Sequence, residues 1–343
     1  MDRSVLFSPV KLKNITLPGR IVRAATEYFC AAPDGHVLPC EIEVYEKLGR
    51  QPLGMIIVAN TCVSPEGRSN LWQNALWDDE FLPDTRRIAS AAQALGVPAI
   101  IQLGHGGSRG EGNNGGRRVL TPDTMTCEDI RMVVRAFANA ALRAKQAGLS
   151  GVELHCAHGF LLSSFFYPET NHRTDKYGGS AENRFRIIDE IIKAVKAKCG
   201  DDYPLFMKIN VTDANKSETY YADLVTVLNR AGDMLDAVET SGWHAIESGV
   251  ARNPYFLDEV RRLHNDVSVP LIEVGGLRDA RGMIDAIQAG ASAVSVSRPL
   301  LCEPGFAAKI RDCEGIVSRC KGCGACFSPR DRASIVRCPF ADK

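Results

Sequence analysis

Eight short apolar runs alternate with amphipathic segments along the chain, and this alternation restricts the fold more than any other feature. Each run is rich in β-branched residues and is bounded by Gly, Pro or polar turn residues, as buried strands usually are. The runs are residues 21–26, 54–61, 98–104, 151–157, 204–211, 237–242, 269–276 and 293–298. The segments between them have helical periodicity, and several end in Gly, a common stop signal. Examples are residues 84–96, 129–148, 183–200 and 279–291.

Strands that alternate with helices predict a parallel sheet. Eight strand–helix units favour a closed (β/α)8 TIM barrel, because the alternative, a doubly wound open sheet, usually has fewer strands. A barrel carries its reactive groups at the C-terminal ends of the strands. Polar residues or glycines follow all eight runs: Thr26–Glu27, Asn60, Gln102, His155, Lys208, His244, Gly275–Gly276 and Ser297–Arg298. We therefore expect a barrel over residues 1–312, with one functional rim, and a short cysteine-rich extension over 313–343.

Composition excludes several classes of partner. The 41 basic residues balance the 41 acidic ones, so no strong field favours nucleic acid or an anionic membrane. No apolar run approaches the roughly 18 residues of a spanning helix, and the first residues have no signal-peptide core. We expect a cytoplasmic protein, in which scattered cysteines are free and buried. These cysteines are Cys30, Cys40, Cys62, Cys127, Cys156, Cys199, Cys302 and Cys313.

The Gly-rich stretch 104–118 is predicted to be a long loop after the third strand. No helix opens directly behind it, so it is not a dinucleotide-binding fingerprint. We therefore expect the chain to have no Rossmann domain of its own.

Two histidines, His155 and His158, lie three residues apart at the end of the fourth run. Such a pair can simply bond nearby carbonyls in a loop, and a zinc site is disfavoured because the helical HExxH arrangement is absent. However, the segment GVELHCAHGFLLSSFFYPETNHRTDKYGGSAENR (151–184) resembles the old yellow enzyme family, and the resemblance extends from residue 6 to about residue 312. It implies an FMN-binding barrel in which both imidazoles donate hydrogen bonds to a substrate carbonyl. Such donors stabilise the charge that hydride transfer pushes onto the oxygen.

The same resemblance implies a set of FMN-binding residues, taken from the segments IVRAATEYF, GMIIVANT, IQLGHGG and MKIN. Around the ring system it places Ala24, Ala25, Thr26, Asn60 and Gln102. Lys208 corresponds to a cationic side chain near the flavin N1–C2 carbonyl, where positive charge favours the anionic reduced flavin. The segments EVGGLRDA and SVSRPL match the phosphate loops, where backbone N–H groups bind anions. They supply Gly275, Gly276, Ser297 and Arg298.

The sequence departs from the family at Phe160, where relatives carry a Tyr that protonates the substrate. A phenyl ring cannot donate a proton. The triplet Gly-Trp-His at 242–244 resembles that of bacterial 2,4-dienoyl-CoA reductases, where the His assists protonation. His244 is therefore expected to be the acid or to bind substrate, with water as the alternative. Tyr28 is expected either to bond the substrate carbonyl or to be a half-buried ring.

Four cysteines crowd the C-terminus with the spacing C-x2-C-x2-C-x11-C: Cys320, Cys323, Cys326 and Cys338. Four thiolates suit a [4Fe–4S] cluster or tetrahedral zinc, and an unmetallated tail is the third alternative. The dienoyl-CoA reductases have a comparable cluster tail, whose third gap is one residue longer. Because the chain stops just past the last cysteine, we expect a separate redox protein to feed the cluster. Direct reduction by NADH or NADPH is the rival.

The predicted function is hydride transfer from reduced FMN to an activated C=C bond of an α,β-unsaturated carbonyl or an enoyl or dienoyl thioester. Phe160 keeps a second flavin reaction open, namely oxidation of an amine or cleavage of a C–O or C–N bond. A third alternative is a non-catalytic electron-transfer or metal-binding component. By analogy with similar barrels, a homo-oligomer is expected.

Overall fold

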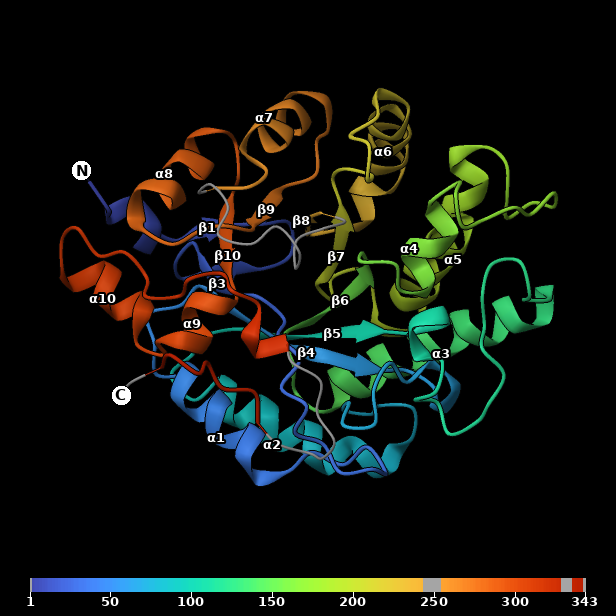
Figure 1. The fold of residues 1–343 in the computed structure, drawn as a ribbon, viewed down its shortest axis with the longest axis horizontal. Coiled ribbons are helices and arrows are strands. Elements are labelled where there is room, and N and C mark those ends of the chain that lie inside the picture. Colours follow the sequence, from blue (N-terminus) through green and yellow to red (C-terminus); the bar gives the residue numbers. More distant parts are fainter. Residues whose placement is uncertain (1, 243–253, 328–334, 342–343) are drawn as a thin grey trace.

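The computed structural model describes residues 2–242, 254–327 and 335–341. Its centre is a closed barrel of eight parallel strands in the order β10-β3-β4-β5-β6-β7-β8-β9, which confirms the predicted fold. Figure 1 shows the strands at the centre and the helices around them. The barrel strands are β3 (Ile21–Arg23), β4 (Met55–Cys62), β5 (Ala99–Gly104), β6 (Gly151–Cys156), β7 (Leu205–Asn210), β8 (Ala237–Ser241), β9 (Leu271–Val274) and β10 (Ala293–Val296).

The first strand is shorter than its apolar run. The backbone N–H of Ala24 still donates to the carbonyl of Val296 at 3.1 Å, but strand β3 has already ended at Arg23. Residues 25–29 have no strand pairing and form a loop at the end of the barrel. The other predicted strands agree with the structure to within about two residues at most ends.

Helices follow the strands and cover the outside of the barrel. They are α1 (Pro39–Leu48), α2 (Leu82–Ala92), α3 (Cys127–Gln146), α4 (Leu161–Phe166), α5 (Ala181–Cys199), α6 (Glu218–Ala231), α7 (Leu257–Asp266), α8 (Ala280–Gln288), α9 (Arg298–Cys302) and α10 (Phe306–Asp312). A small antiparallel pair, β1 (Val10–Lys11) and β2 (Thr16–Leu17), precedes the barrel. Side-chain caps fix where the long helices begin: Thr126 and Asp129 form a capping box on α3, and Ser180 caps α5.

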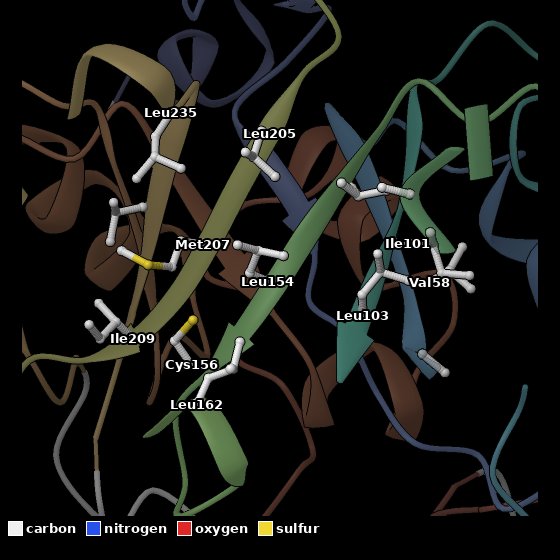
Figure 2. Packing of buried hydrophobic residues seen from close by; sticks show 14 of the residues in the cluster. Val58, Ile101, Leu103, Leu154, Cys156, Leu162, Leu205, Met207, Ile209 and Leu235 are labelled. Atoms are coloured by element: carbon white, nitrogen blue, oxygen red, sulfur yellow. The ribbon is translucent and has the colours of Figure 1, made fainter. Parts of the chain in front are cut away.

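The core has two parts. Between the strands and the helices lies a large apolar cluster that includes Leu154 and Met207, shown close up in Figure 2. Inside the barrel a smaller cluster includes Ile100 and Phe206, with Leu17 of the N-terminal hairpin packed against it. Side chains alternate along a strand, so the residues two positions further on also point inward. In β5 and β7 these residues are the polar Gln102 and Lys208. The barrel interior toward the C-terminal ends of the strands is therefore available for chemistry.

One correction concerns the cysteines. Cys30 and Cys40 form a disulfide, although both were expected to be free. The bridge between Ala31 and Val37 turns the chain back on itself and brings Cys40, at the start of α1, to Cys30. Four of the remaining scattered cysteines are buried as expected, but Cys127 and Cys313 are exposed.

Gly54, just before β4, is required by a close backbone approach. A Cβ added there would lie 1.9 Å from the carbonyl oxygen of Gly19, so Gly54→Ala must push two main-chain segments apart. We expect this substitution to lower the free energy of unfolding by about 1–3 kcal/mol, as overpacking usually does. Gly305→Ala is the control, because a Cβ at Gly305 meets no atom within 4 Å. Urea denaturation of both variants tests this, and equal stabilities would contradict it.

Among the helices of the described residues, none combines the length and the apolar character that membrane crossing requires.

Candidate active site

A cavity of about 540 Å³ opens at the C-terminal end of the barrel. All eight strands, or the loops that follow them, contribute to its wall, because parallel strands in a closed barrel end on the same rim. The volume lies within the range of small-molecule and cofactor sites. All ten residues predicted to bind FMN line this cavity: Ala24, Ala25, Thr26, Asn60, Gln102, Lys208, Gly275, Gly276, Ser297 and Arg298.

The local backbone explains why Asn60 faces the cavity. The register between β4 and β5 shifts between Val58 and Thr61, and such a bulge re-aims the side chains beside it. A Cβ at Gly104 would lie 2.0 Å from Asn60 Oδ1, so a glycine is needed opposite. Asn60 Oδ1 is itself buried without a hydrogen-bond partner in the protein.

Several cavity residues have polar atoms that fit a bound flavin. Besides Asn60 Oδ1, the buried Ser295 Oγ and His155 Nδ1 have no protein partner, and buried polar atoms normally have one. Gly275 and Gly276, which follow β9 and line the cavity, have positive φ angles of 136° and 71°. Turns of this kind present backbone N–H groups to anions. The unpaired polar atoms and the glycine turn together suit FMN.

Two arginines, Arg278 and Arg298, also line the cavity, and the Arg298 guanidinium donates to the Tyr255 hydroxyl at 3.3 Å. Arg278 follows Gly276 by two residues, so the phosphate-loop motif was a signal for it. Tyr255 comes from the segment before α7, and no sequence pattern indicated it.

The two histidines lie side by side on the cavity wall, with ring centroids 5.1 Å apart. His158 Nε2 is 2.7 Å from the hydroxyl of Ser241, and its φ of 63° is left-handed. Burial lowers the pKa of His158 to about 3 and that of His155 well below its usual value, with the positive charge of Lys208 acting in the same direction. Both rings are therefore neutral at neutral pH. The ring centroid of Phe160 lies 4.6 Å from that of His155.

Buried carboxyl groups lie on both faces of the barrel wall: Glu153 and Glu239 point into the barrel, and Glu273 points toward α7. Lys208 Nζ is 2.6 Å from Glu239, so the predicted cation is balanced by an anion. Gln102 donates to Glu153 at 2.6 Å. Burial raises the pKa of Glu153 well above its usual value and that of Glu273 to about 8, so both are expected to be protonated at neutral pH.

Tyr28 is placed differently from the expectation. Its side chain is 2 % exposed and does not line the cavity, because its hydroxyl accepts a hydrogen bond of 2.6 Å from the buried Arg23 guanidinium. The structure therefore places Tyr28 outside the cavity as a fully buried ring, and its role in bonding a substrate carbonyl stays a prediction. His244, the predicted acid, lies outside the described residues.

The cavity also has lining residues that were not predicted to act. Glu27 and Phe29 follow Thr26 in the same loop, and Ser69 and Asn70 approach from the segment after β4. Arg109, which is exposed, comes from the Gly-rich loop. Glu27 and Phe29 had a signal, since both lie in the motif IVRAATEYF that was already assigned to the flavin.

The tail packs against the same site. Cys320 and Gly322 line the cavity, and the backbone N–H of Val336 donates to the carbonyl of Tyr28 at 3.0 Å. Within the residues that the structure describes, no three Cys, His, Asp or Glu side chains are arranged to hold a metal ion. Burial and a hydrogen bond with Cys338 raise the pKa of the Cys302 thiol to about 12.

Comparisons with known proteins agree on one family. Residues 5–314 match the NADH:flavin oxidoreductase / NADH oxidase family. An NADPH dehydrogenase of Halalkalibacterium halodurans is 31% identical over 313 residues, covering 87% of this chain and 91% of that protein. One of Bacillus subtilis is 30% identical over 315 residues, covering 88% and 93%.

Solved structures show the same fold. An old yellow enzyme homologue from Zymomonas mobilis matches with a TM-score of 0.79 and 21% identity, covering 91% of this chain and 94% of that one. A complex of 2-naphthoyl-CoA reductase with 2-naphthoyl-CoA matches with a TM-score of 0.84 and 24% identity. The match covers 95% of this chain but only 55% of that reductase. With the family match extending over most of its length, the chain belongs to the NADH:flavin oxidoreductase / NADH oxidase family and is an FMN-dependent oxidoreductase.

Proposed function

We propose that the protein reduces an activated C=C bond of an α,β-unsaturated carbonyl or of an enoyl or dienoyl thioester. The observation that carries this proposal is the pair of neutral imidazoles, His155 and His158, in the cavity that holds the predicted flavin residues. NADPH is the proposed reductant, because the curated relatives described above are NADPH dehydrogenases.

FMN would be held with its ring against Ala24–Thr26, Asn60 and Gln102, and with its phosphate at the glycine turn and Arg298. Asn60 Oδ1 would then gain the hydrogen-bond partner that it lacks within the protein. When bound, FMN supplies hydride chemistry.

The chain's own residues would hold the substrate. An N–H group of each neutral imidazole donates to the carbonyl oxygen, which becomes more negative as hydride reaches the β-carbon. Ser241 holds the His158 ring at 2.7 Å, so this donor is already oriented before substrate arrives. The phenyl ring of Phe160 adds an apolar surface beside His155.

Anaerobic mixing of NADPH-reduced enzyme with candidate acceptors tests the proposal. We expect enones or enoyl thioesters to restore the oxidised flavin spectrum and to yield saturated products. The rival reaction, supported by the absence of a tyrosine at Phe160, predicts instead that amines bleach the oxidised flavin. Failure of every unsaturated carbonyl and thioester, together with bleaching by an amine, would overturn the reductase.

We also propose that the tail (313–343) is a separate unit attached to the barrel (1–312), and that Cys320, Cys323, Cys326 and Cys338 hold a [4Fe–4S] cluster. Support comes from their spacing and from Cys320 on the cavity wall, which suits electron delivery to a flavin. This tail also supports a likeness to the dienoyl-CoA reductases, with a protein electron donor as the alternative to NADPH. The described thiols are not arranged around an ion, so binding would require them to converge.

Iron and sulfide analysis after anaerobic reconstitution tests the cluster. Cys323→Ser is expected to lose iron, whereas Cys127→Ser, an exposed cysteine far from the tail in sequence, is expected to keep it. Cys302→Ser is a further variant, because this thiol contacts Cys338 and could replace a tail ligand. Bound zinc, or no metal at all, would rule the cluster out.

A further inference from the structure

Glu27 lines the cavity but has no role in the predicted site. It lies in the loop after β3 and lines the same cavity as His155 and Phe160. Its Oε1 accepts a hydrogen bond from the backbone N–H of Phe29 at 3.3 Å. Its Oε2 is buried and makes no hydrogen bond of normal geometry, although the Asn70 side chain lies close enough to lower the pKa of the carboxyl group. Buried polar atoms without partners are rare in folded proteins, and each one calls for an explanation.

The surroundings of Glu27 favour its neutral form. Burial, followed by the carboxyl group of Glu41 on α1, raises the pKa of Glu27 to about 8. The N–H of Phe29, the Asn70 side chain and the positive charge of Arg68 act in the opposite direction. Arg68 does not pair with Glu27, since its guanidinium donates to the backbone carbonyls of Pro33 and Leu71. At neutral pH the carboxyl group therefore carries a proton.

The reduction consumes one proton, which an acid in this cavity can supply. Phe160 has no exchangeable proton, and burial keeps both imidazoles neutral, so neither is charged to act as an acid. Among the described residues that line the cavity, Glu27 is the one carboxylic acid. A carboxyl group with a pKa near the working pH is well suited to general acid catalysis.

We infer that Glu27 is the proton donor of the reduction. It takes the role of the tyrosine that relatives carry at the position of Phe160. This inference rests on the proposed function. Hydride forms the new C–H bond at the β-carbon, and the π electrons move toward the carbonyl oxygen. The O–H bond of Glu27 then breaks as its proton forms the C–H bond at the α-carbon. The remaining carboxylate regains a proton from water before the next turnover, so one hydride and one proton are added in all.

Three variants test this role: Glu27→Gln, Glu27→Gln with Phe160→Tyr, and the control Glu111→Gln, which makes the same change at an exposed carboxyl outside the cavity lining. Reoxidation of the reduced enzyme by an enone is followed by anaerobic stopped flow across pH. The wild-type rate should fall as pH rises through about 8, because the acid loses its proton. Glu27→Gln should be about 10²-fold slower and lose this pH dependence. The double variant should regain rate, with its decline moved toward a pH of about 10, the ordinary pKa of tyrosine.

A spectroscopic readout separates this inference from the proposed function. The infrared difference spectrum between acidic and alkaline samples of the oxidised holoenzyme should contain the C=O band of a protonated carboxyl that titrates near 8. Glu273 has a similar pKa, so the band should be weaker in Glu27→Gln than in the wild type and unchanged in Glu111→Gln. If no unsaturated acceptor reacts with the wild type, the proposed function fails while this band is still tested. A wild-type rate and pH profile in Glu27→Gln would overturn the inference, as would loss of the pH dependence in His244→Ala alone.

Discussion

Removing both imidazoles, with His155→Leu and His158→Ala together, should slow reduction of an enone by about 10⁴-fold. Each is proposed to donate to an oxygen that gains negative charge, and loss of one such donor typically costs about 10²–10³-fold in kcat. The rings are neutral, so their removal does not change the charge of the cavity. His158 already has a left-handed φ of 63°, and alanine at that position adds no new backbone strain. Single-turnover reoxidation of the reduced enzyme measures the effect.

The control for this prediction is Ser241→Ala. Ser241 Oγ lies 2.7 Å from His158 Nε2 and orients the ring without touching the carbonyl in the proposed complex. Its loss should cost much less than either histidine. FMN content and the rate of reduction by NADPH should stay close to wild type in both proteins. A double-histidine variant that reduces enones at more than a tenth of the wild-type rate would show that the carbonyl is held elsewhere.

The sequence predicted the barrel and the ring of cofactor residues for a physical reason. Strand ends in a parallel barrel converge on one rim, so a residue such as Gln102 or Arg298 is placed as soon as its strand is recognised. This reasoning needs only the order of strands and their approximate ends. It tolerates errors of one or two residues, which is why the early end of β3 did not displace Thr26.

The failures come from loops and from tertiary contacts. Tyr28 and Glu27 are neighbours in a segment without strand pairing, so no alternation rule says which one faces the cavity. Their positions depend on Arg23, which is buried and holds the Tyr28 hydroxyl. The Cys30–Cys40 disulfide likewise depends on how the turn between Ala31 and Val37 positions two cysteines, and a turn signal in the sequence does not specify that pairing. Loops are where sequence periodicity gives no information, and they also carry much of the chemistry.

The buried carboxyl groups beside Lys208 show a different limit of sequence reasoning. The resemblance implied a cationic Lys208 near the flavin N1–C2 carbonyl, and the structure adds Glu239 at 2.6 Å from its ammonium group. Both side chains are nearly inaccessible to solvent, at 7% and 0% exposure, so they must compensate each other. Glu153 contributes no charge at neutral pH, because burial holds its pKa well above the usual value. The electrostatic effect of Lys208 on a bound flavin is therefore that of an ion pair.

Lys208→Met should accordingly destabilise the protein more than an ordinary core substitution. Removing one member of a buried ion pair leaves an uncompensated charge, at a cost of about 3–5 kcal/mol, whereas replacing both members with apolar residues is often close to neutral. The variant Lys208→Met with Glu239→Met should therefore recover most of the lost stability. Urea denaturation without FMN measures this, because ligand binding would otherwise add to the stability of the folded state. If the double variant is no more stable than Lys208→Met, the two groups do not compensate each other, and Lys208 is free to act on the flavin as a lone cation.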